Sequence, residues 1–487
     1  MQNHYAWRSV LVLARGLIVW SGWRNLECHT GLSPRSYRVV GQAELGSWES
    51  PRLGSTESLP HPILQCARAR QHPVLHHIED KHKPVGRKPS MLSYLFCTPW
   101  KIIFGDIVRH YITPIMLPIL ERNYVPDFLI RYCARMEIAM ELAKLKALKS
   151  EDEIKNKIEF VKELKTMPIA IQTKKANDQH YEVPDEFYRL SLGSYMKYSS
   201  GYWPSAKTTL EESEIAMLEL YCERAGIVDG MKLIDLGCGW GSVTIYMANK
   251  YRNCTIVSIS NSNSQREYIY SKAQSMGLDN ITVYTGDINN FDLPKELYNT
   301  ADRVISIEMF EHMKNYQLLM AKVSNWIKPG GKLFIHIFTH KDIPGHYSEG
   351  WMTDNFFTGG TLPSDDLLLY FQDNLKIESQ WRVNGKHYQK TLEAWLRKMD
   401  NNKDTVMPVL AKAYGKKDAL KWYVNWRLFY IGCAEFFGFK DGFSLTHSYL
   451  LTHSLTHSLT HSFTYLLTHS LTHSLRGRVS SQSLPFR

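Results

Sequence analysis

The 487-residue sequence lacks several patterns that mark common classes of protein. Its eight cysteines form no Cys-x-x-Cys pair and show no metal-ligand spacing with histidine, so we predict reduced thiols, no metal site and a cytoplasmic protein. The apolar run from Ser9 to Trp20 is broken by Arg15 and is too short to cross a bilayer. Charged residues likewise interrupt the apolar stretch from Met91 to Tyr124. The sequence therefore predicts no membrane-spanning segment.

The chain also lacks a basic region within its expected folded part. The net charge is +10, but residues 1–90 carry +6 and residues 443–487 carry +3, which leaves +1 for residues 91–442. A nucleic-acid-binding protein needs positive charge gathered on its folded surface. We therefore expect no nucleic-acid partner.

Both ends of the chain are unlike a folded domain. Residues 1–90 are rich in Pro, Ser, Gly and His without sustained periodicity, and we expect a disordered leader or an extended gene model, with Met91 as the native start. Residues 443–487 form a low-complexity tail in which Leu-Thr-His-Ser recurs six times from Leu445. Histidines at four-residue spacing would line one face of a helix and could bind metal. A translated tetranucleotide DNA repeat explains the same period, and we favour that reading.

Residues 91–174 are expected to form a helical N-terminal region. Pro126 can open a helix that runs to about Leu148. Ser150 to Glu153 is a capping-box pattern for a second helix, whose Ile154, Ile158, Val161 and Leu164 form an apolar stripe. Such a stripe usually packs into a protein core, and contact with lipid is the alternative.

From residue 175 to 442, short Val/Ile/Leu-rich runs alternate with helical periodicity. This alternation predicts an α/β fold with a mostly parallel, doubly wound sheet, and ligands at the carboxyl ends of its strands. The predicted strands are 232–236, 255–260, 281–285, 303–307, 332–338 and 376–383. The predicted helices are 210–225, 242–250, 264–276 and 316–326, with more between 391 and 437, and a long insertion lies between 338 and 371.

A glycine turn follows the first predicted strand. Asp235 is followed by Gly237, Gly239 and Gly241, which lack Cβ, so the backbone can turn sharply and approach a ligand closely. The spacing differs from dinucleotide-binding sites, and the turn lacks the Lys-Ser/Thr of a P-loop. It resembles the S-adenosylmethionine-binding motif of class I methyltransferases, in which a Rossmann-like sheet holds the cofactor. In that reading Asp235 binds the amino-acid end of S-adenosylmethionine.

The fourth predicted strand ends in a group of acid and base side chains. If a helix begins there, Glu308, Glu311 and His312 lie on one face at positions i, i+3 and i+4. Two carboxylates beside an imidazole can hold a cationic amine and accept its proton. The alternative is an ordinary helix start, where acidic residues are favoured.

Five segments together resemble the cyclopropane-fatty-acid-synthase-like methyltransferases, and within that group the coclaurine N-methyltransferase branch. The resemblance covers about residues 125–442. The segments are Asn177-Asp-Gln-His-Tyr-Glu-Val-Pro184, Tyr198-Ser-Ser-Gly-Tyr-Trp203, the glycine turn, Ser260-Asn-Ser-Asn-Ser-Gln265 and Glu308-Met-Phe-Glu-His312. Glu308 favours the N-methylating branch, because the lipid-modifying branch typically has Gly there.

The resemblance implies roles for particular residues. Cofactor contacts are implied for Ser199, Gly237, Asn261, Gln265, Asp287 and Ile288, with Asp287 on the adenine amine and Ile288 against its ring. Catalysis is implied for Glu308, Glu311 and His312. The bicarbonate-binding positions of cyclopropane synthases correspond to Glu311, His336 and Tyr388, whereas their cysteine corresponds to Ser200 and does not match.

Three functions follow as hypotheses. The first is S-adenosylmethionine-dependent N-methylation of a small-molecule amine. The second is methyl or methylene transfer to unsaturated lipid acyl chains, which alone would involve bicarbonate and membrane contact. The third is a non-catalytic cofactor-binding relic. A homodimer is compatible with each.

The last strand of the class I sheet is absent from its usual place in the sequence. Family members end with an antiparallel strand rich in Trp, Val and Phe, where this chain begins its repeat. Because residues 443–451 alternate apolar and polar side chains, we predict a strand or extended segment within 443–452 and disorder beyond. We also predict lower stability than with a family-type ending.

Overall fold

The computed structural model describes residues 113–145, 150–173, 183–347, 350–439 and 444–453. The predictions for residues 1–90, and for the tail after residue 453, lie outside these ranges. Within the described part of the chain, no helix is long and apolar enough to span a bilayer. No cluster of His, Cys, Asp or Glu with metal-binding geometry occurs there either.

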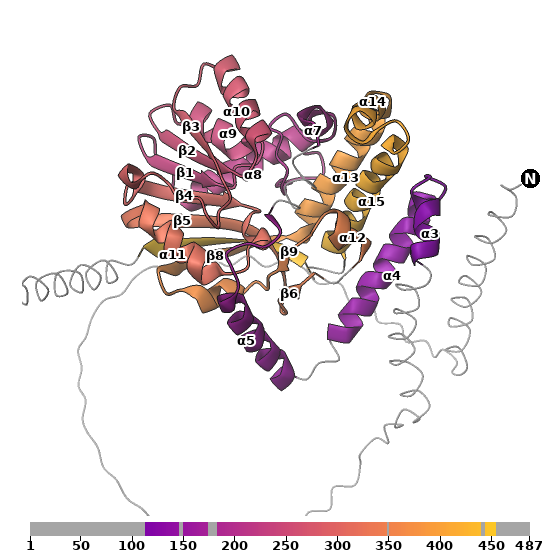
Figure 1. The fold of residues 1–487 in the computed structure, drawn as a ribbon, viewed down its shortest axis with the longest axis horizontal. Helices are drawn as coiled ribbons and strands as arrows, with labels where there is room; N and C mark the ends of the chain where they lie inside the picture. Colours follow the sequence, from indigo (N-terminus) through magenta and orange to yellow (C-terminus); the bar gives the residue numbers. More distant parts are fainter. Residues whose placement is uncertain (1–112, 146–149, 174–182, 348–349, 440–443, 454–487) are drawn as a thin grey trace, which may run out of the picture. The chain divides into compact units, whose positions relative to one another are not determined.

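A seven-stranded sheet forms the centre of the fold, in the order β3-β2-β1-β4-β5-β9-β8 (Figure 1). The first five strands in this order pair in parallel, and β9 runs antiparallel to both of its neighbours. The strands are β1 (Lys232–Leu236), β2 (Thr255–Ser260), β3 (Ile281–Thr285), β4 (Ala301–Ile307), β5 (Ile327–His340), β8 (Leu375–Asn384) and β9 (Ser444–His453). The predicted α/β fold with a mostly parallel sheet is confirmed.

Helices cover both faces of the sheet. Each face carries apolar side chains, which must be packed away from water. One face packs against α8 (Leu210–Ala225), α9 (Ser242–Lys250) and α10 (Asn263–Ser275), and the other against α5 (Ser150–Thr166) and α11 (Tyr316–Trp326). Local signals set these helix ends. The N-cap side chain of Thr209 and Glu212 form a capping box at the start of α8, which ends at Gly226 in the left-handed conformation.

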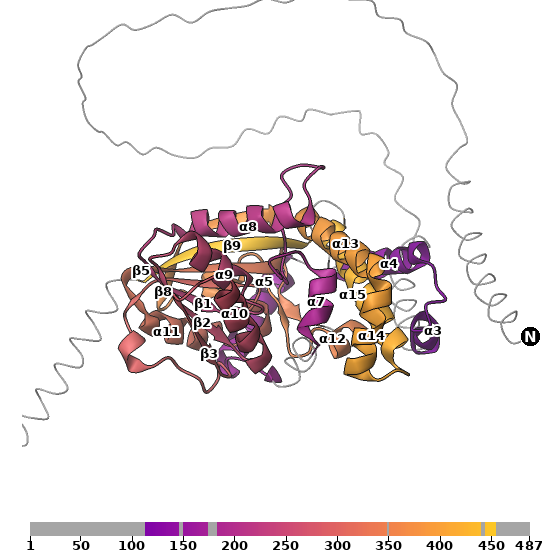
Figure 2. The same cartoon turned by 90° about the horizontal axis from the view of Figure 1, so that it is seen from above.

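A second group of helices lies beside the sheet (Figure 2). It consists of α7 (Asp185–Ser191), α12 (Trp351–Asn355), α13 (Gly385–Asn401), α14 (Lys403–Tyr414) and α15 (Ala419–Gly438). These helices share one apolar core that includes Trp395, Trp426 and Tyr430. Their position beside the sheet leaves α13 and α15 in contact with β9.

The predicted N-terminal helices form, and they pack in two different places. The helix α4 (Asp127–Leu145) packs on α15, where Arg131 pairs with Glu435 at 2.9 Å. The helix α5 instead packs against α11 and buries Val161 and Leu164. Core packing is therefore the observed role of these two residues of the apolar stripe, although Ile154 is 65% exposed. A further short helix, α3, spans Thr113–Leu120.

The segment after β5 is folded rather than a simple loop. It contains β6 (Gly345–His346) and β7 (Thr361–Leu362), which pair with each other, followed by the 3-10 helix η4 (Leu367–Phe371). Further 3-10 turns are η2 (Lys295–Leu297) and η3 (Phe310–His312). The η3 turn lies directly after β4, in the region predicted to carry the chemistry.

The repeat tail supplies the last strand of the sheet. β9 pairs with β5 on one side and β8 on the other, and its residues from Leu445 to Leu451 are all buried. The strand predicted within residues 443–452 is confirmed. Because β9 occupies an interior position, the sheet continues beyond the predicted domain end at residue 442. That boundary was set by the change in composition, which does not mark the end of the fold.

Candidate functional site

The glycine turn joins β1 to α9 and leaves one side of its backbone open. Gly237, Gly239 and Gly241 have φ values of +83°, +52° and +78°, which favour glycine. A Cβ on Gly237 or Gly241 would collide with Met309 or Ile269, whereas one on Gly239 would meet no atom within 4 Å. The backbone at Gly239 is thus accessible to a ligand. Bonds of 2.9 and 3.0 Å from the amides of Gly237 and Cys238 to Ile259 hold the turn against β2.

Asp235 lies at the end of β1 but is largely enclosed. Its carboxylate accepts a 2.6 Å hydrogen bond from the Thr244 hydroxyl, which also lies 2.7 Å from the hydroxyl of Ser258. Burial raises the pKa of Asp235 to about 6, against the lowering effect of the Thr244 hydrogen bonds. The structure therefore gives Asp235 a role in fixing α9 to the sheet, and its contact with the amino-acid end of a cofactor stays a prediction.

The ends of β2 and β3 carry the residues implied for ribose and adenine. Gln265 is buried on α10, and its amide oxygen accepts a 2.7 Å bond from Ser260, while its Nε2 has no partner among the described residues. Asp287 accepts hydrogen bonds from Thr173 at 2.5 Å and from the backbone amide of Asn289 at 2.9 Å. Ile288 is only 9% exposed, and Asn261 is exposed. An orphan buried amide donor and an open glycine turn fit a polar cofactor.

Glu308 is held in a strained backbone conformation at the end of β4. Its φ of +48° lies in the left-handed region, which costs about 1–3 kcal/mol for a non-glycine residue. A 2.7 Å bond from its amide to the carbonyl of His336 on β5 fixes it there. The chain then makes only the three-residue turn η3, so the predicted helix that would align Glu308 with Glu311 and His312 is absent.

The carboxylate of Glu308 accepts hydrogen bonds from two distant parts of the chain. It accepts hydrogen bonds from the amide of Ser200 at 2.9 Å and from the hydroxyl of Tyr388 on α13 at 2.6 Å. His336 Nε2 lies 3.9 Å from its Oε1. Burial raises the pKa of Glu308, and the positive charge of Lys197 together with these two hydrogen bonds limits the rise.

Glu311 is buried with both carboxyl oxygens unpaired among the described residues. Burial and the nearby charge of Glu308 raise its pKa well above the usual value. Glu311 thus tends to be protonated until a positive charge arrives beside it. His312 is the next residue of η3 and is half-buried.

Three of the predicted anion-site residues meet at Glu308. Ser200 and Tyr388 donate to it and His336 lies beside it, but no hydrogen bond within the described residues joins Glu311 to them. A carboxylate of the chain itself therefore already accepts the Ser200 and Tyr388 hydrogen bonds. That arrangement is unfavourable for a bound bicarbonate, whose charge would repel Glu308.

Two side chains that the sequence analysis did not identify complete the cluster. Lys197 is fully buried, and its ammonium donates to the hydroxyl of Ser199 at 2.5 Å and the carbonyl of Ser200 at 2.6 Å. Burial lowers the pKa of Lys197 to about 8, although Glu308 acts against the shift. Ser448 of β9 lies 2.9 Å from Nδ1 of His336. Lys197 could have been found from the sequence, because it lies next to the Tyr198-Ser-Ser motif. Ser448 could not, because the repeat contains several equivalent serines.

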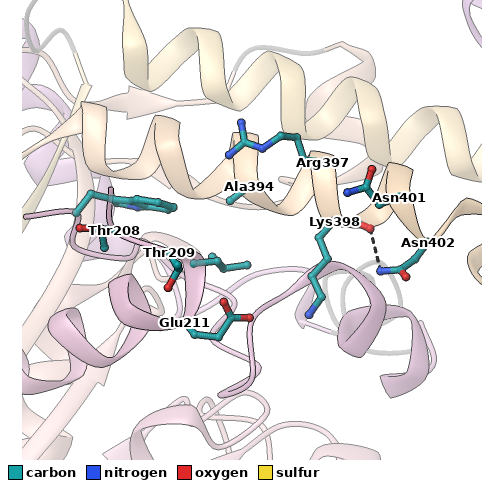
Figure 3. Close-up of a pocket in the computed structure, with 10 residues that line it drawn as sticks. Thr208, Thr209, Glu211, Ala394, Arg397, Lys398, Asn401 and Asn402 are labelled. Carbon is teal, nitrogen blue, oxygen red and sulfur yellow. Dashed lines mark hydrogen bonds between the residues drawn. The ribbon is translucent and has the colours of Figure 1, made fainter. Parts of the chain in front are cut away.

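A separate pocket of about 360 Å³ lies between the start of α8 and α13 (Figure 3). Its walls include Thr209, Glu211, Arg397, Lys398 and Asn402. None of the predicted catalytic or cofactor residues lines it, so we assign it no part in the chemistry.

Comparison with known proteins places this geometry in a family. Residues 170–443 match the family model described as mycolic acid cyclopropane synthetase. The (S)-coclaurine N-methyltransferase of Papaver somniferum is 38% identical over 343 residues, which cover 69% of this chain and 95% of that protein. The enzyme of that name from Thalictrum flavum subsp. glaucum is 37% identical over 344 residues, or 69% of this chain and 94% of that protein.

A solved structure agrees with the sequence matches. Coclaurine N-methyltransferase bound to N-methylheliamine and SAH has 37% sequence identity and a TM-score of 0.67, and the match covers 70% of this chain and 99% of that one. The resemblance expected from the sequence motifs is thereby confirmed. The chain belongs to the mycolic acid cyclopropane synthetase family, and its matches include the coclaurine N-methyltransferases.

Proposed function

We propose that this chain is an S-adenosylmethionine-dependent methyltransferase that methylates the nitrogen of a small-molecule amine. One observation carries the choice of acceptor: the carboxylate of Glu308 accepts the hydrogen bonds of Ser200 and Tyr388, so the site presents negative charge. A carboxylate attracts a protonated amine and repels bicarbonate. The related coclaurine N-methyltransferases and the structure with N-methylheliamine and SAH support this assignment.

The cofactor would lie along the carboxyl ends of β1, β2 and β3. Gly239 offers close backbone approach, and Ile288 offers an apolar surface for a flat ring. Gln265 Nε2 offers a donor that has no partner among the described residues. Asn261, Asp287 and Ser199 remain proposed contacts. When bound, S-adenosylmethionine supplies an electrophilic methyl group that the amine lone pair takes as the carbon–sulfur bond breaks, leaving a neutral thioether.

The residues after β4 prepare the amine. Each oxygen of Glu308 accepts one hydrogen bond and keeps a lone pair, so it can accept an amine N–H and orient the nitrogen. With a positive charge beside it, Glu311 ionises and can take the proton that the nitrogen loses. Its two carboxyl oxygens have no hydrogen-bond partner among the described residues, and His312 is the second base. Positioning makes the larger contribution, as in bimolecular transfers generally.

Labelled methyl transfer tests the proposal. The purified chain is incubated with methyl-labelled S-adenosylmethionine and either coclaurine and other secondary amines or vesicles of unsaturated phospholipid. Label in an N-methylated amine is expected. Label in the lipid alone would favour acyl-chain modification and overturn the proposal.

A parallel binding measurement separates the remaining hypothesis. Cofactor binding without turnover on any amine or lipid would support the non-catalytic relic. The relic hypothesis depends on a missing last strand, whereas β9 fills that position between β5 and β8.

A further inference from the structure

The repeat tail places a hydroxyl against a histidine of the candidate site. In the antiparallel pairing of β5 with β9, Ser448 is the direct partner of His336. Both side chains are fully buried, and Ser448 Oγ lies 2.9 Å from His336 Nδ1. Thus a residue from a Leu-Thr-His-Ser repeat contacts a side chain beside Glu308.

The second partner of Ser448 determines which atom carries the proton. Arg224 on α8 donates to Ser448 Oγ at 3.1 Å, since a guanidinium has only donors. His336 and Arg224 are the two side-chain partners of this hydroxyl in the described part of the chain. The Ser448 hydrogen would be unpaired in a buried site unless it is donated to His336 Nδ1. Pairing of the Ser448 hydroxyl therefore leaves Nδ1 as an acceptor.

The opposite nitrogen of His336 must then bear the ring proton. His336 is neutral, because burial and the positive charges of Lys197 and Arg224 lower its pKa well below the usual value. A neutral imidazole with an accepting Nδ1 carries its hydrogen on Nε2. Nε2 is the atom 3.9 Å from Glu308 Oε1 and has no hydrogen-bond partner among the described residues.

We propose that Ser448 is a positioning residue that holds His336 in the Nε2–H tautomer, so that an N–H dipole rather than a lone pair lies beside the Glu308 carboxylate. The N–H favours the ionised form of Glu308, which is the form that attracts an amine. The tyrosine ring of Tyr221, 4.9 Å from the imidazole between ring centroids, limits other orientations of His336. The catalytic part of this inference rests on the proposed N-methylation, whereas the tautomer does not.

Three variants of β9 test the role of the hydroxyl. Ser448→Ala removes it, and Ser448→Thr keeps it. Thr446→Val is the matched control, because Thr446 lies two residues away on the same face, is 1% exposed, and its Oγ1 makes no hydrogen bond in the described structure. Both Ser448→Ala and Thr446→Val remove a buried hydroxyl from β9. Only Ser448→Ala also removes the hydrogen bond to His336.

The first measurement reads the tautomer by NMR of protein with ¹⁵N-labelled histidine, with His336 assigned from the signals lost in His336→Gln. The wild type, Ser448→Thr and Thr446→Val should show a protonated Nε2 and a bare Nδ1. In Ser448→Ala the proton should move wholly or partly to Nδ1. An unchanged tautomer in Ser448→Ala would overturn the proposal, whatever the enzyme's substrate.

The second measurement is the pH dependence of methyl transfer. Ser448→Ala should lower kcat about tenfold, the effect of one lost hydrogen bond, and shift the acidic limb of kcat/KM to higher pH. Ser448→Thr should restore most of both, and Thr446→Val should change neither. Adding Ser448→Ala to His336→Gln should have no further effect on kcat. An equal loss in Thr446→Val, or a full tenfold loss in the His336→Gln background, would show a structural role only.

Failure of the proposed function gives a different pattern. If the wild type methylates no amine, the kinetic measurement gives no result, but the NMR measurement still reports the His336 tautomer. The two failures are therefore distinguishable.

Discussion

The candidate site is defined at the residue scale by charges that are buried rather than exposed. Lys197 and two hydrogen bonds stabilise the negative charge of Glu308. The carboxyl oxygens of Glu311 have no hydrogen-bond partner among the described residues. A buried carboxyl group without partners is costly when ionised, so it gains most from a cation placed beside it. Both a sulfonium and an ammonium meet that need.

Glycine 239 offers a test of the cofactor site. Gly239→Val should abolish the rise in melting temperature caused by S-adenosylmethionine or its demethylated product, because a branched side chain would fill the open space beside the turn. A ligand at 100 times its dissociation constant stabilises a protein by about 2.7 kcal/mol, so the wild-type shift is measurable.

The control for this variant is Gly277→Val. Gly277 also has a positive φ, +61°, and a Cβ there would likewise meet no atom within 4 Å, so the control reproduces backbone strain away from the site. It should lower the melting temperature yet keep the ligand-induced rise. A normal ligand shift in Gly239→Val would contradict the assignment of the glycine turn.

Glu311 is the second test at this scale. Glu311→Gln should lower turnover by about 10²–10⁴-fold while cofactor binding persists, since the amide cannot accept a proton. Lost binding of the cofactor, measured by calorimetry, would instead assign Glu311 to the fold.

The same variant should change how stability depends on pH. Because the pKa of Glu311 is raised in the folded state, its carboxyl disfavours folding increasingly as pH rises above the ordinary value of 4.5. The denaturant midpoint of Glu311→Gln, compared with that of the wild type, should therefore increase as pH rises from 4 towards neutrality.

The most informative element is β9, because a four-residue repeat is compatible with a strand. A period of four is twice the strand period of two, so Leu and His fall on one face and Thr and Ser on the other. Both faces of β9 are buried. The polar repeat residues therefore lose hydrogen bonds to water, as at His447, whose two ring nitrogens have no partner among the described residues. Tyr449 and Leu451 on the same face pack into the core.

The burial of His447 predicts that the stability contributed by β9 falls in acid. Burial lowers its pKa to about 4, so the unfolded chain binds a proton that the folded chain does not between pH 6.5 and 4. Stability contributed by neutral His447 is thus lost as pH falls through that range. His447→Phe should raise the urea midpoint most at pH 4.5, and a gain independent of pH would refute the titration.

At the scale of the whole molecule, the sheet depends on residues that look dispensable in the sequence. An interior strand satisfies backbone groups of two neighbours, and each buried group left unpaired costs about 1–3 kcal/mol. Total stability is only about 5–15 kcal/mol. We expect a protein ending at Phe443 not to fold cooperatively, whereas one ending at Ser454 should keep its urea midpoint and cofactor binding.

A family-type ending completes this comparison. A strand rich in Trp, Val and Phe in place of residues 444–453 should raise the urea midpoint, because it removes the buried polar atoms of Thr446 and His447 that lack partners among the described residues. Equal midpoints would show that the repeat strand is as good a fit as the family ending, and the predicted lower stability would be wrong.

The sequence by itself determined the local elements and the family. The predicted limits 232–236, 255–260 and 281–285 match β1, β2 and β3, because short buried strands between turn residues carry a strong local signal. The glycine turn was equally clear, since left-handed backbone needs glycine. The strand in the tail followed from its alternation of apolar and polar residues.

Only the tertiary structure decided what lies beside Glu308. The left-handed turn there replaces the expected helix because the amide of Glu308 bonds to His336, a partner on a neighbouring strand. The contacts of Tyr388 and Ser448 join positions 80 and 112 residues apart along the chain. Their pairing depends on strand register and helix packing, which arise from long-range contacts that no local pattern encodes.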